Sequence, residues 1–147
     1  MKRRTPATIL LLAEPDEVRV EYAEALRNAG LRVVETSDSR AALESMNATR
    51  PTVIVADLNS RLRDDRLSLC REIKDNPSTK SIPVLLTTAG MKDDDAALAT
   101  DPGVLVLTLA QHDGAKLLAA LNGVLAAQRA EPARASLRRR KNVSRSA

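Results

Sequence analysis

The chain has 147 residues and a mass of 15.9 kDa, which fits one ordinary domain or one domain with a tail. Its 44% hydrophobic and 29% charged residues are typical of a soluble globular protein, and no apolar run approaches the roughly 20 residues that a transmembrane helix needs. A single cysteine and a single histidine exclude an internal disulfide framework and a zinc site of the usual nitrogen and sulfur kind. We therefore predict a cytoplasmic protein that does not bind membranes.

The net charge of +4 is distributed unevenly along the sequence. Residues 129–147 carry +6, and the other 128 residues carry −2, or −5 without Lys2, Arg3 and Arg4. The body is thus mildly acidic and has two basic ends. Because the chain also lacks Trp and Phe, nucleic-acid binding is not expected except weakly, through the electrostatic attraction of the basic tail. A flexible solubilising extension is the alternative interpretation of that tail.

Five aliphatic runs, which we interpret as strands, recur along the chain at residues 9–12, 31–34, 53–56, 83–86 and 104–107. Strands this uniformly apolar are covered on both faces, as in a parallel sheet between helices. Apolar residues at intervals of three and four predict helices between and after these runs, at residues 18–29, 42–46, 69–73, 93–99 and 117–125. Gly30 fits a helix C-cap, and Ser39 and Asp113 fit N-caps.

This alternation predicts an α/β domain with a five-stranded parallel sheet and helices on both faces. We place the domain at residues 8–128, after a basic extension at 1–7 and before a basic tail at 129–147. The tail has only two large apolar residues, so we expect it to be disordered. Tyr22 and Cys70 fall on apolar helix faces and are predicted to lie in the core.

Polar side chains follow the strands at the edge of the sheet where ligands usually bind, beyond the carboxyl ends of the strands. Glu14 and Asp16 follow the first strand, Asp57 ends the third, and Thr87 and Thr88 end the fourth. Carboxylates that converge at one edge repel each other unless a cation lies between them, and Mg²⁺ is the usual one. A carboxylate held against Mg²⁺ can attack a phosphoryl group. The alternatives are that Asp57 caps a loop, that Asp16 caps a helix and that the Thr88 hydroxyl satisfies nearby backbone groups.

No enzyme motif is recognisable. None of the five glycines belongs to a G-x-G-x-x-G or phosphate-binding loop, and a lone histidine argues against a Ser-His-Asp triad. We interpret His112 as a solvated residue before the last helix and residues 93–95 as a solvated acidic helix start. The sequence therefore predicts a protein that is not an enzyme.

From Thr8 to about Gln128, the chain resembles the receiver domain of bacterial two-component response regulators. Residues 51–58 look like that family's third strand with its phospho-accepting aspartate, Asp57. Residues 70–84 resemble its third helix, the following loop and its fourth strand, and Thr88-Ala89 lies where the family keeps a hydroxyl that contacts the phosphoryl group. The resemblance implies strand order 2-1-3-4-5 and phosphotransfer to Asp57 from a histidine kinase or phosphotransfer protein. It also implies Mg²⁺ held by Glu14, Asp16 and Asp57.

The sequence departs from the family pattern at several places. Receivers carry two consecutive acidic residues after the first strand, and here Pro15 interrupts them, so that either Ala13 and Glu14 or Glu14 and Pro15 take those positions. The loop after Asp57 lacks the usual proline and glycine. The fifth strand lacks its aromatic residue, and Ala110 replaces the lysine that pairs with the phosphoryl group. A replacement charge could come from a nearby arginine, for which the candidates are Arg61, Arg63 and Arg66.

Two functions follow from this resemblance. The first is a receiver domain that accepts a phosphoryl group on Asp57, with Thr88 as a contact, and then switches its binding to a downstream protein. The second is a pseudo-receiver, which keeps the fold as an interaction module that works without phosphorylation.

Overall fold

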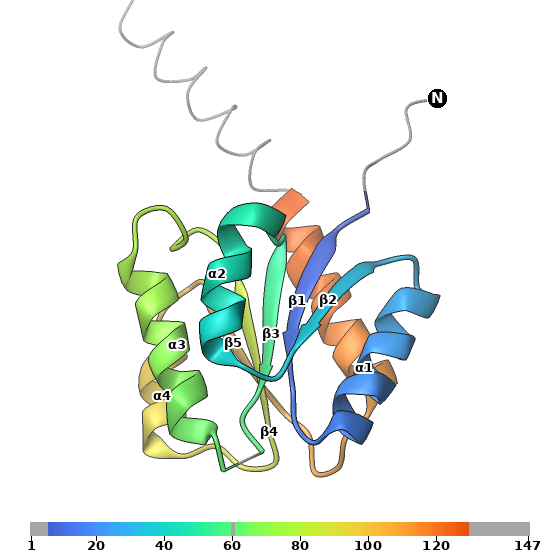
Figure 1. Cartoon of the computed structure of the whole chain (residues 1–147). Coiled ribbons are helices and arrows are strands. Elements are labelled where there is room, and N and C mark those ends of the chain that lie inside the picture. Colours follow the sequence, from blue (N-terminus) through green and yellow to red (C-terminus); the bar gives the residue numbers. More distant parts are fainter. Residues whose placement is uncertain (1–5, 60, 130–147) are drawn as a thin grey trace, which may run out of the picture.

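The structure is a computed structural model that describes residues 6–59 and 61–129 (Figure 1). Strands and helices alternate in the order β1 (Thr8–Leu12), α1 (Asp16–Asn28), β2 (Arg32–Thr36), α2 (Ser39–Thr49), β3 (Val53–Asp57), α3 (Arg63–Asp75), β4 (Val84–Thr88), α4 (Asp93–Leu98) and β5 (Val104–Thr108). A last helix covers residues 114–129. Disorder was predicted for the basic tail at residues 129–147. Of these residues, 130–147 lie outside the described ranges.

All five strands are parallel and lie in the order β2-β1-β3-β4-β5. This confirms the predicted fold class and strand order. The connections run outward in opposite directions from β1 and β3, so the strand order reverses between these two central strands. The loops that follow them separate at their carboxyl ends, which is where sheets of this kind form a binding crevice. Asp57 is the last residue of β3 and lies at this edge.

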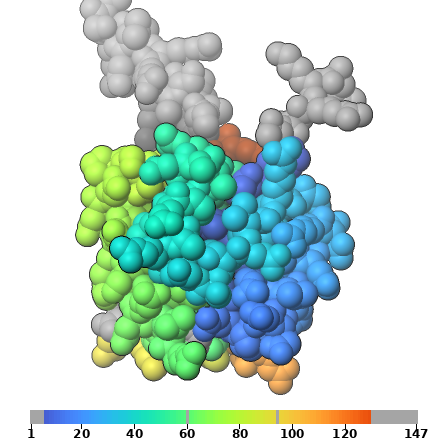
Figure 2. Space-filling view, viewed as in Figure 1, coloured from blue at the N-terminus to red at the C-terminus, as the bar shows by residue number. Residues whose placement is uncertain are grey.

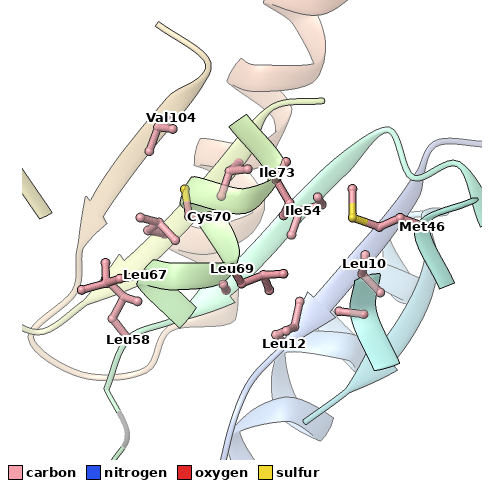
Figure 3. Close-up of a cluster of buried hydrophobic side chains, with 14 residues drawn as sticks. Leu10, Leu12, Met46, Ile54, Leu58, Leu67, Leu69, Cys70, Ile73 and Val104 are labelled. Carbon is pink, nitrogen blue, oxygen red and sulfur yellow. The ribbon is translucent and has the colours of Figure 1, made fainter. Parts of the chain in front are cut away.

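One face of the sheet packs against α2, α3 and α4. Figure 3 shows this layer, with Ile73 of α3 beside Ile54 of β3 and Met46 of α2 beside Leu10 of β1. Cys70 belongs to the same cluster and is 1% exposed, as predicted for a core residue. The buried thiol therefore acts as a small hydrophobic side chain.

The other face of the sheet packs against α1 and the last helix. Its cluster includes Leu11 of β1, Tyr22 and Leu26 of α1, and Leu121 of the last helix, all fully buried. The central strands alternate side chains between the two clusters, so each strand is apolar on both faces. This confirms why these runs carry no polar alternation.

The start of α2 differs from the prediction. Asp38, not Ser39, is the N-cap residue, and its side chain accepts a hydrogen bond from the backbone N–H of Arg40. Ser39 is buried, and its hydroxyl accepts a hydrogen bond from the Arg66 guanidinium. The predicted cap at Asp113 is confirmed, since its carboxylate accepts from the N–H of Lys116. In the described part of the chain, no helix is long and apolar enough to cross a membrane.

Replacing Leu121 with alanine should lower the free energy of unfolding by about 2–5 kcal/mol, because it removes buried methyl groups and leaves a cavity between the last helix and the sheet. Leu105→Ala is the matched control. That side chain is 44% exposed on the edge strand β5, so its loss should cost less than about 1 kcal/mol. Urea denaturation of the two variants measures the difference, and equal costs would contradict this packing.

Candidate functional site

The site is centred on Asp57, whose side chain is buried at the carboxyl end of β3. In the sheet register, Asp57 lies opposite Thr87 of β4. The Thr87 hydroxyl donates a hydrogen bond to Asp57 Oδ1 at 2.8 Å, and the Asn59 amide donates to the same oxygen at 3.2 Å. Both groups are uncharged, so the carboxylate is held by neutral donors from its own loop and the neighbouring strand.

Asn59 also connects the loops that follow β3 and β4. Its side-chain oxygen accepts a hydrogen bond from the backbone N–H of Ala89 at 2.7 Å, while its amide donates to Asp57. Nothing in the sequence pattern distinguished Asn59 from other polar loop residues. Its position closes the edge of the sheet over the carboxylate.

The other carboxylate oxygen, Asp57 Oδ2, faces His112. The distance from His112 Nε2 is 3.5 Å, and both atoms are buried without a hydrogen-bond partner in the described ranges. The His112 ring lies edge-on to Tyr22 of α1, with ring centroids 5.8 Å apart and an interplanar angle of 73°. The interpretation of His112 as a solvated residue was therefore wrong. It lies beside Asp57 because the chain turns back toward the sheet edge before the last helix begins.

Burial governs the electrostatics of this site. It raises the pKa of the Asp57 carboxyl above its ordinary value, while the Thr87 hydrogen bond and the charge of His112 act in the opposite direction. Burial, together with the nearby charge of Asp57, also raises the pKa of Tyr22 to about 12. Tyr22 thus remains a neutral phenol.

The predicted metal ligands do not come together. Asp16 points into solvent with 81% of its side chain exposed and pairs with Arg19 at 2.9 Å. Glu14 is half-buried and precedes Pro15. Among the residues that the structure describes, no three His, Cys, Asp or Glu side chains form a group that could hold a metal ion. The structure therefore does not confirm the expected cluster of Glu14, Asp16 and Asp57, and Mg²⁺ binding by these residues stays a prediction.

Thr88, the predicted phosphoryl contact, makes no hydrogen bond to Asp57 within the described ranges. Its hydroxyl donates to the carbonyl of Gly90 at 2.9 Å and accepts from the Gly90 N–H at 3.3 Å. Thr87 makes the contact with Asp57 instead. Because alternate residues of a strand share a face, the pairing of β3 with β4 decides which threonine reaches the carboxylate, and that register was not predictable from the sequence.

Of the three candidate arginines, Arg63 and Arg66 are engaged with other groups, and Arg61 is exposed and forms no ion pair with Asp57. Arg63 pairs with Asp95, and Arg66 donates to the carbonyl of Ser37 at 2.6 Å, to Ser39 at 2.8 Å and to Asp65 at 3.0 Å. Arg66 is 1% exposed and links the start of α3 to the loop before α2. Asp95 is fully buried, so the acidic run was not wholly solvated as predicted. Ala110, in the lysine position, is exposed.

Comparison with known proteins gives the same class as the fold. No protein-family model matches the chain. It is 30% identical to the transcriptional regulatory protein CseB of Streptomyces coelicolor over 117 residues, which are 80% of this chain and 48% of that protein. The chain thus spans about half the length of this curated relative.

Solved structures agree in fold. Chemotaxis protein CheY4 of Vibrio cholerae superposes with a TM-score of 0.71 at 21% identity, over 82% of this chain and 99% of that one. The receiver domain of sensor histidine kinase PA1611 from Pseudomonas aeruginosa, solved with magnesium in its active-site cleft, gives 0.65 at 23% identity over 80% and 95%. The chain therefore has the fold of CheY-like receiver domains, with Asp57 at the carboxyl end of β3. It resembles response regulators over 80% of its own length.

Replacing Asp57 with asparagine should stabilise the fold at pH 7 by about 1–3 kcal/mol, because the buried negative charge is removed while the acceptor for Thr87 remains. The folded-state pKa of Asp57 lies above its ordinary value of 3.8, so the charge penalty is absent below that value and develops as the pH rises through the folded-state pKa. The gain should therefore shrink as the pH is lowered toward about 4.

Urea unfolding of both proteins between about pH 4 and pH 7.5 tests this dependence. Asp16→Asn is the control, since an exposed carboxylate should give a small difference with little dependence on pH. A stability difference for Asp57→Asn that does not change with pH would contradict the assigned burial penalty.

Proposed function

We propose that the chain is a pseudo-receiver: a non-enzymatic, cytoplasmic protein-interaction module of two-component signalling that works without phosphorylation. The observation that supports this most directly is the state of Asp57. Its carboxylate is buried, is held by two neutral donors and faces His112, and no group of acidic side chains in the described chain could hold a metal beside it. In this function Asp57 has a structural role, tying β3 to β4 and to the loop before the last helix.

The chemistry of phosphoryl transfer supports the same conclusion. The transferred group carries charge on three oxygens, and catalysis consists mainly of positioning and of neutralising that charge. Receiver domains supply this with acidic residues that hold a divalent cation and with a lysine. Here one residue of the acidic pair is missing, the nearby Asp16 is exposed and pairs with Arg19, and Ala110 stands in the lysine position. The carboxylate that remains is buried, and this burial raises its pKa, which favours its protonated form.

The surface of the domain offers what an interaction module needs. The edge strand β5 exposes Leu105, which lines an apolar groove of about 480 Å³ together with Pro83, Ala120 and Val124. Contiguous exposed apolar surface of this kind marks interaction sites in soluble proteins. A protein partner from the same signalling system fits this proposal.

Phosphorylation of Asp57 is the second candidate function, and one observation favours it. Asp57 lies at the carboxyl end of the central strand β3 with a hydroxyl, that of Thr87, against its carboxylate. In that function a histidine kinase or phosphotransfer protein would supply the phosphoryl group, and a downstream protein would bind the product.

Incubation of the full chain with acetyl phosphate, with and without MgCl₂, tests the two functions by intact mass spectrometry. A pseudo-receiver should show no added phosphoryl group at any donor concentration. Asp57→Asn is the negative control, since it removes the acceptor. Uptake by the parent chain that is lost in Asp57→Asn would overturn the proposal and favour phosphotransfer.

A restored variant makes the negative result interpretable. Ala13→Asp combined with Ala110→Lys returns an acidic residue after β1 and the lysine after β5. If the missing acidic residue and the missing lysine are what prevent phosphorylation, the double variant should gain a phosphoryl group, and this gain should depend on MgCl₂ and on Asp57. Failure of the double variant, with a folded circular-dichroism spectrum, would show that the buried environment of Asp57 and not the missing charges prevents transfer.

A further inference from the structure

The end of the molecule opposite Asp57 carries a second, differently charged site. An open pocket of about 530 Å³ lies where β1 and β3 begin and where α2 and the last helix end. Figure 1 shows these segments at one edge of the fold, and Figure 2 shows their atoms close together along that edge. The polar residues that matter in its lining are Thr8, Arg32, Thr49, Arg50, Thr52 and Arg129.

The three arginines of this pocket, Arg32, Arg50 and Arg129, carry positive charge that the described fold does not neutralise. All three are exposed, and within residues 6–59 and 61–129 none has an ion-pair partner. The pocket lining contains no acidic residue. Ion pairs are instead formed by arginines elsewhere in the fold, namely Arg19, Arg27, Arg63 and Arg66.

The backbone conformation of Arg50 is unfavourable for a residue with a side chain, so the fold loses conformational energy by having an arginine at this position. Arg50 follows α2 with φ 45° and ψ 64°, in the left-handed region. Glycine adopts this conformation freely, whereas a side chain with a Cβ atom costs about 1–2 kcal/mol there. An arginine at the position of a C-cap glycine puts a guanidinium into the pocket where the fold alone would favour glycine or asparagine.

The sequence extends the positive charge from both ends of the described chain. Lys2, Arg3 and Arg4 precede Pro6, a residue of the pocket lining, and six further basic residues follow Arg129 in the remaining tail. The rest of the body is acidic. Both basic ends of the sequence are therefore joined to the fold at this pocket.

We propose that this end of the domain binds the phosphate backbone of double-stranded nucleic acid without sequence specificity. Guanidinium groups bind phosphate oxygens in a bidentate manner, and hydroxyl groups are common additional phosphate contacts. The Thr52 hydroxyl accepts the N–H of Thr8 at 3.2 Å and so can donate its own proton to a phosphate. Arginines line the pocket and lysines do not, which suits phosphate recognition.

The aromatic composition distinguishes this partner from two others. Single-stranded nucleic acids are bound by stacking bases on aromatic rings, and helices that insert into a membrane surface use aromatic and large apolar side chains together with basic ones. The chain has no Trp or Phe, and its one tyrosine, Tyr22, is fully buried. A duplex backbone needs neither contact, because its affinity comes from released counterions.

The test measures binding of a fluorescein-labelled duplex of about 20 base pairs by anisotropy, with NaCl varied between about 50 and 200 mM. The full chain is compared with the triple variant Arg32→Gln/Arg50→Gln/Arg129→Gln. The matched control, Arg40→Gln/Arg71→Gln/Lys116→Gln, removes the same charge at exposed residues outside the pocket. A third variant, Arg138→Gln/Arg139→Gln/Arg140→Gln, isolates the contribution of the tail. Thermal melts confirm that all variants fold.

The pocket variant should bind at least about tenfold more weakly at the lowest salt, and its slope of log K against log salt should fall by about 2–3, since each phosphate contact contributes about 0.9. The matched control should lose much less. Equal losses in the pocket and control variants would overturn the proposal, as would a loss confined to the tail variant. Binding of phosphatidylserine vesicles without binding of the duplex would overturn it in favour of a membrane surface.

Discussion

The burial of one carboxylate, that of Asp57, organises the functional end of this domain. A charged group at the end of a fully apolar strand has lost most of its hydration, so it is tolerated only where donors surround it. Thr87, Asn59 and His112 come from three different segments, and each approaches the same carboxylate. The two loops tied by Asn59 therefore close over a site that in typical receivers stays open to a cation and a phosphoryl donor.

The fold was predictable because its determinants are local and repeated. Each strand is a short aliphatic run, each helix has an apolar stripe, and a parallel sheet is the one architecture that buries both faces of such strands. The site was less predictable because its contacts join distant segments. His112 approaches Asp57 only after the chain has crossed the sheet, and the choice of Thr87 over Thr88 depends on the pairing of β3 with β4. The resemblance to receivers located Asp57 and its sheet edge but not the groups that surround it.

The positions of charged residues were the hardest feature of the structure to predict from the sequence. Arg66 and Asp95 are both buried, although arginine and aspartate are normally exposed. Arg66 is compensated by Ser37 and Ser39 around the start of α2 and by its neighbour Asp65, and Asp95 of α4 is compensated by Arg63 of α3. The sequence of an acidic run such as residues 93–95 does not indicate which carboxylate will find such a partner. We interpreted the whole run as solvated because acidic residues are usually exposed. These pairs engage two of the three candidate arginines after Asp57, namely Arg63 and Arg66, with groups other than Asp57.

The two ends of the sheet carry charges of opposite sign, a buried carboxylate at one end and exposed arginines at the other. At the carboxyl ends of the strands, the site has lost the lysine and one acidic residue of the receiver pattern, and Asp57 is enclosed by neutral donors and His112. At the amino ends, Arg32, Arg50 and Arg129 surround an open pocket without acidic neighbours in its lining. Parallel strands separate the two ends by the full length of the sheet, so we expect substitutions at one end to have little effect on the other. Loss of the phosphoryl chemistry would then place no constraint on the arginine pocket, and the same fold could keep a binding function that does not depend on Asp57.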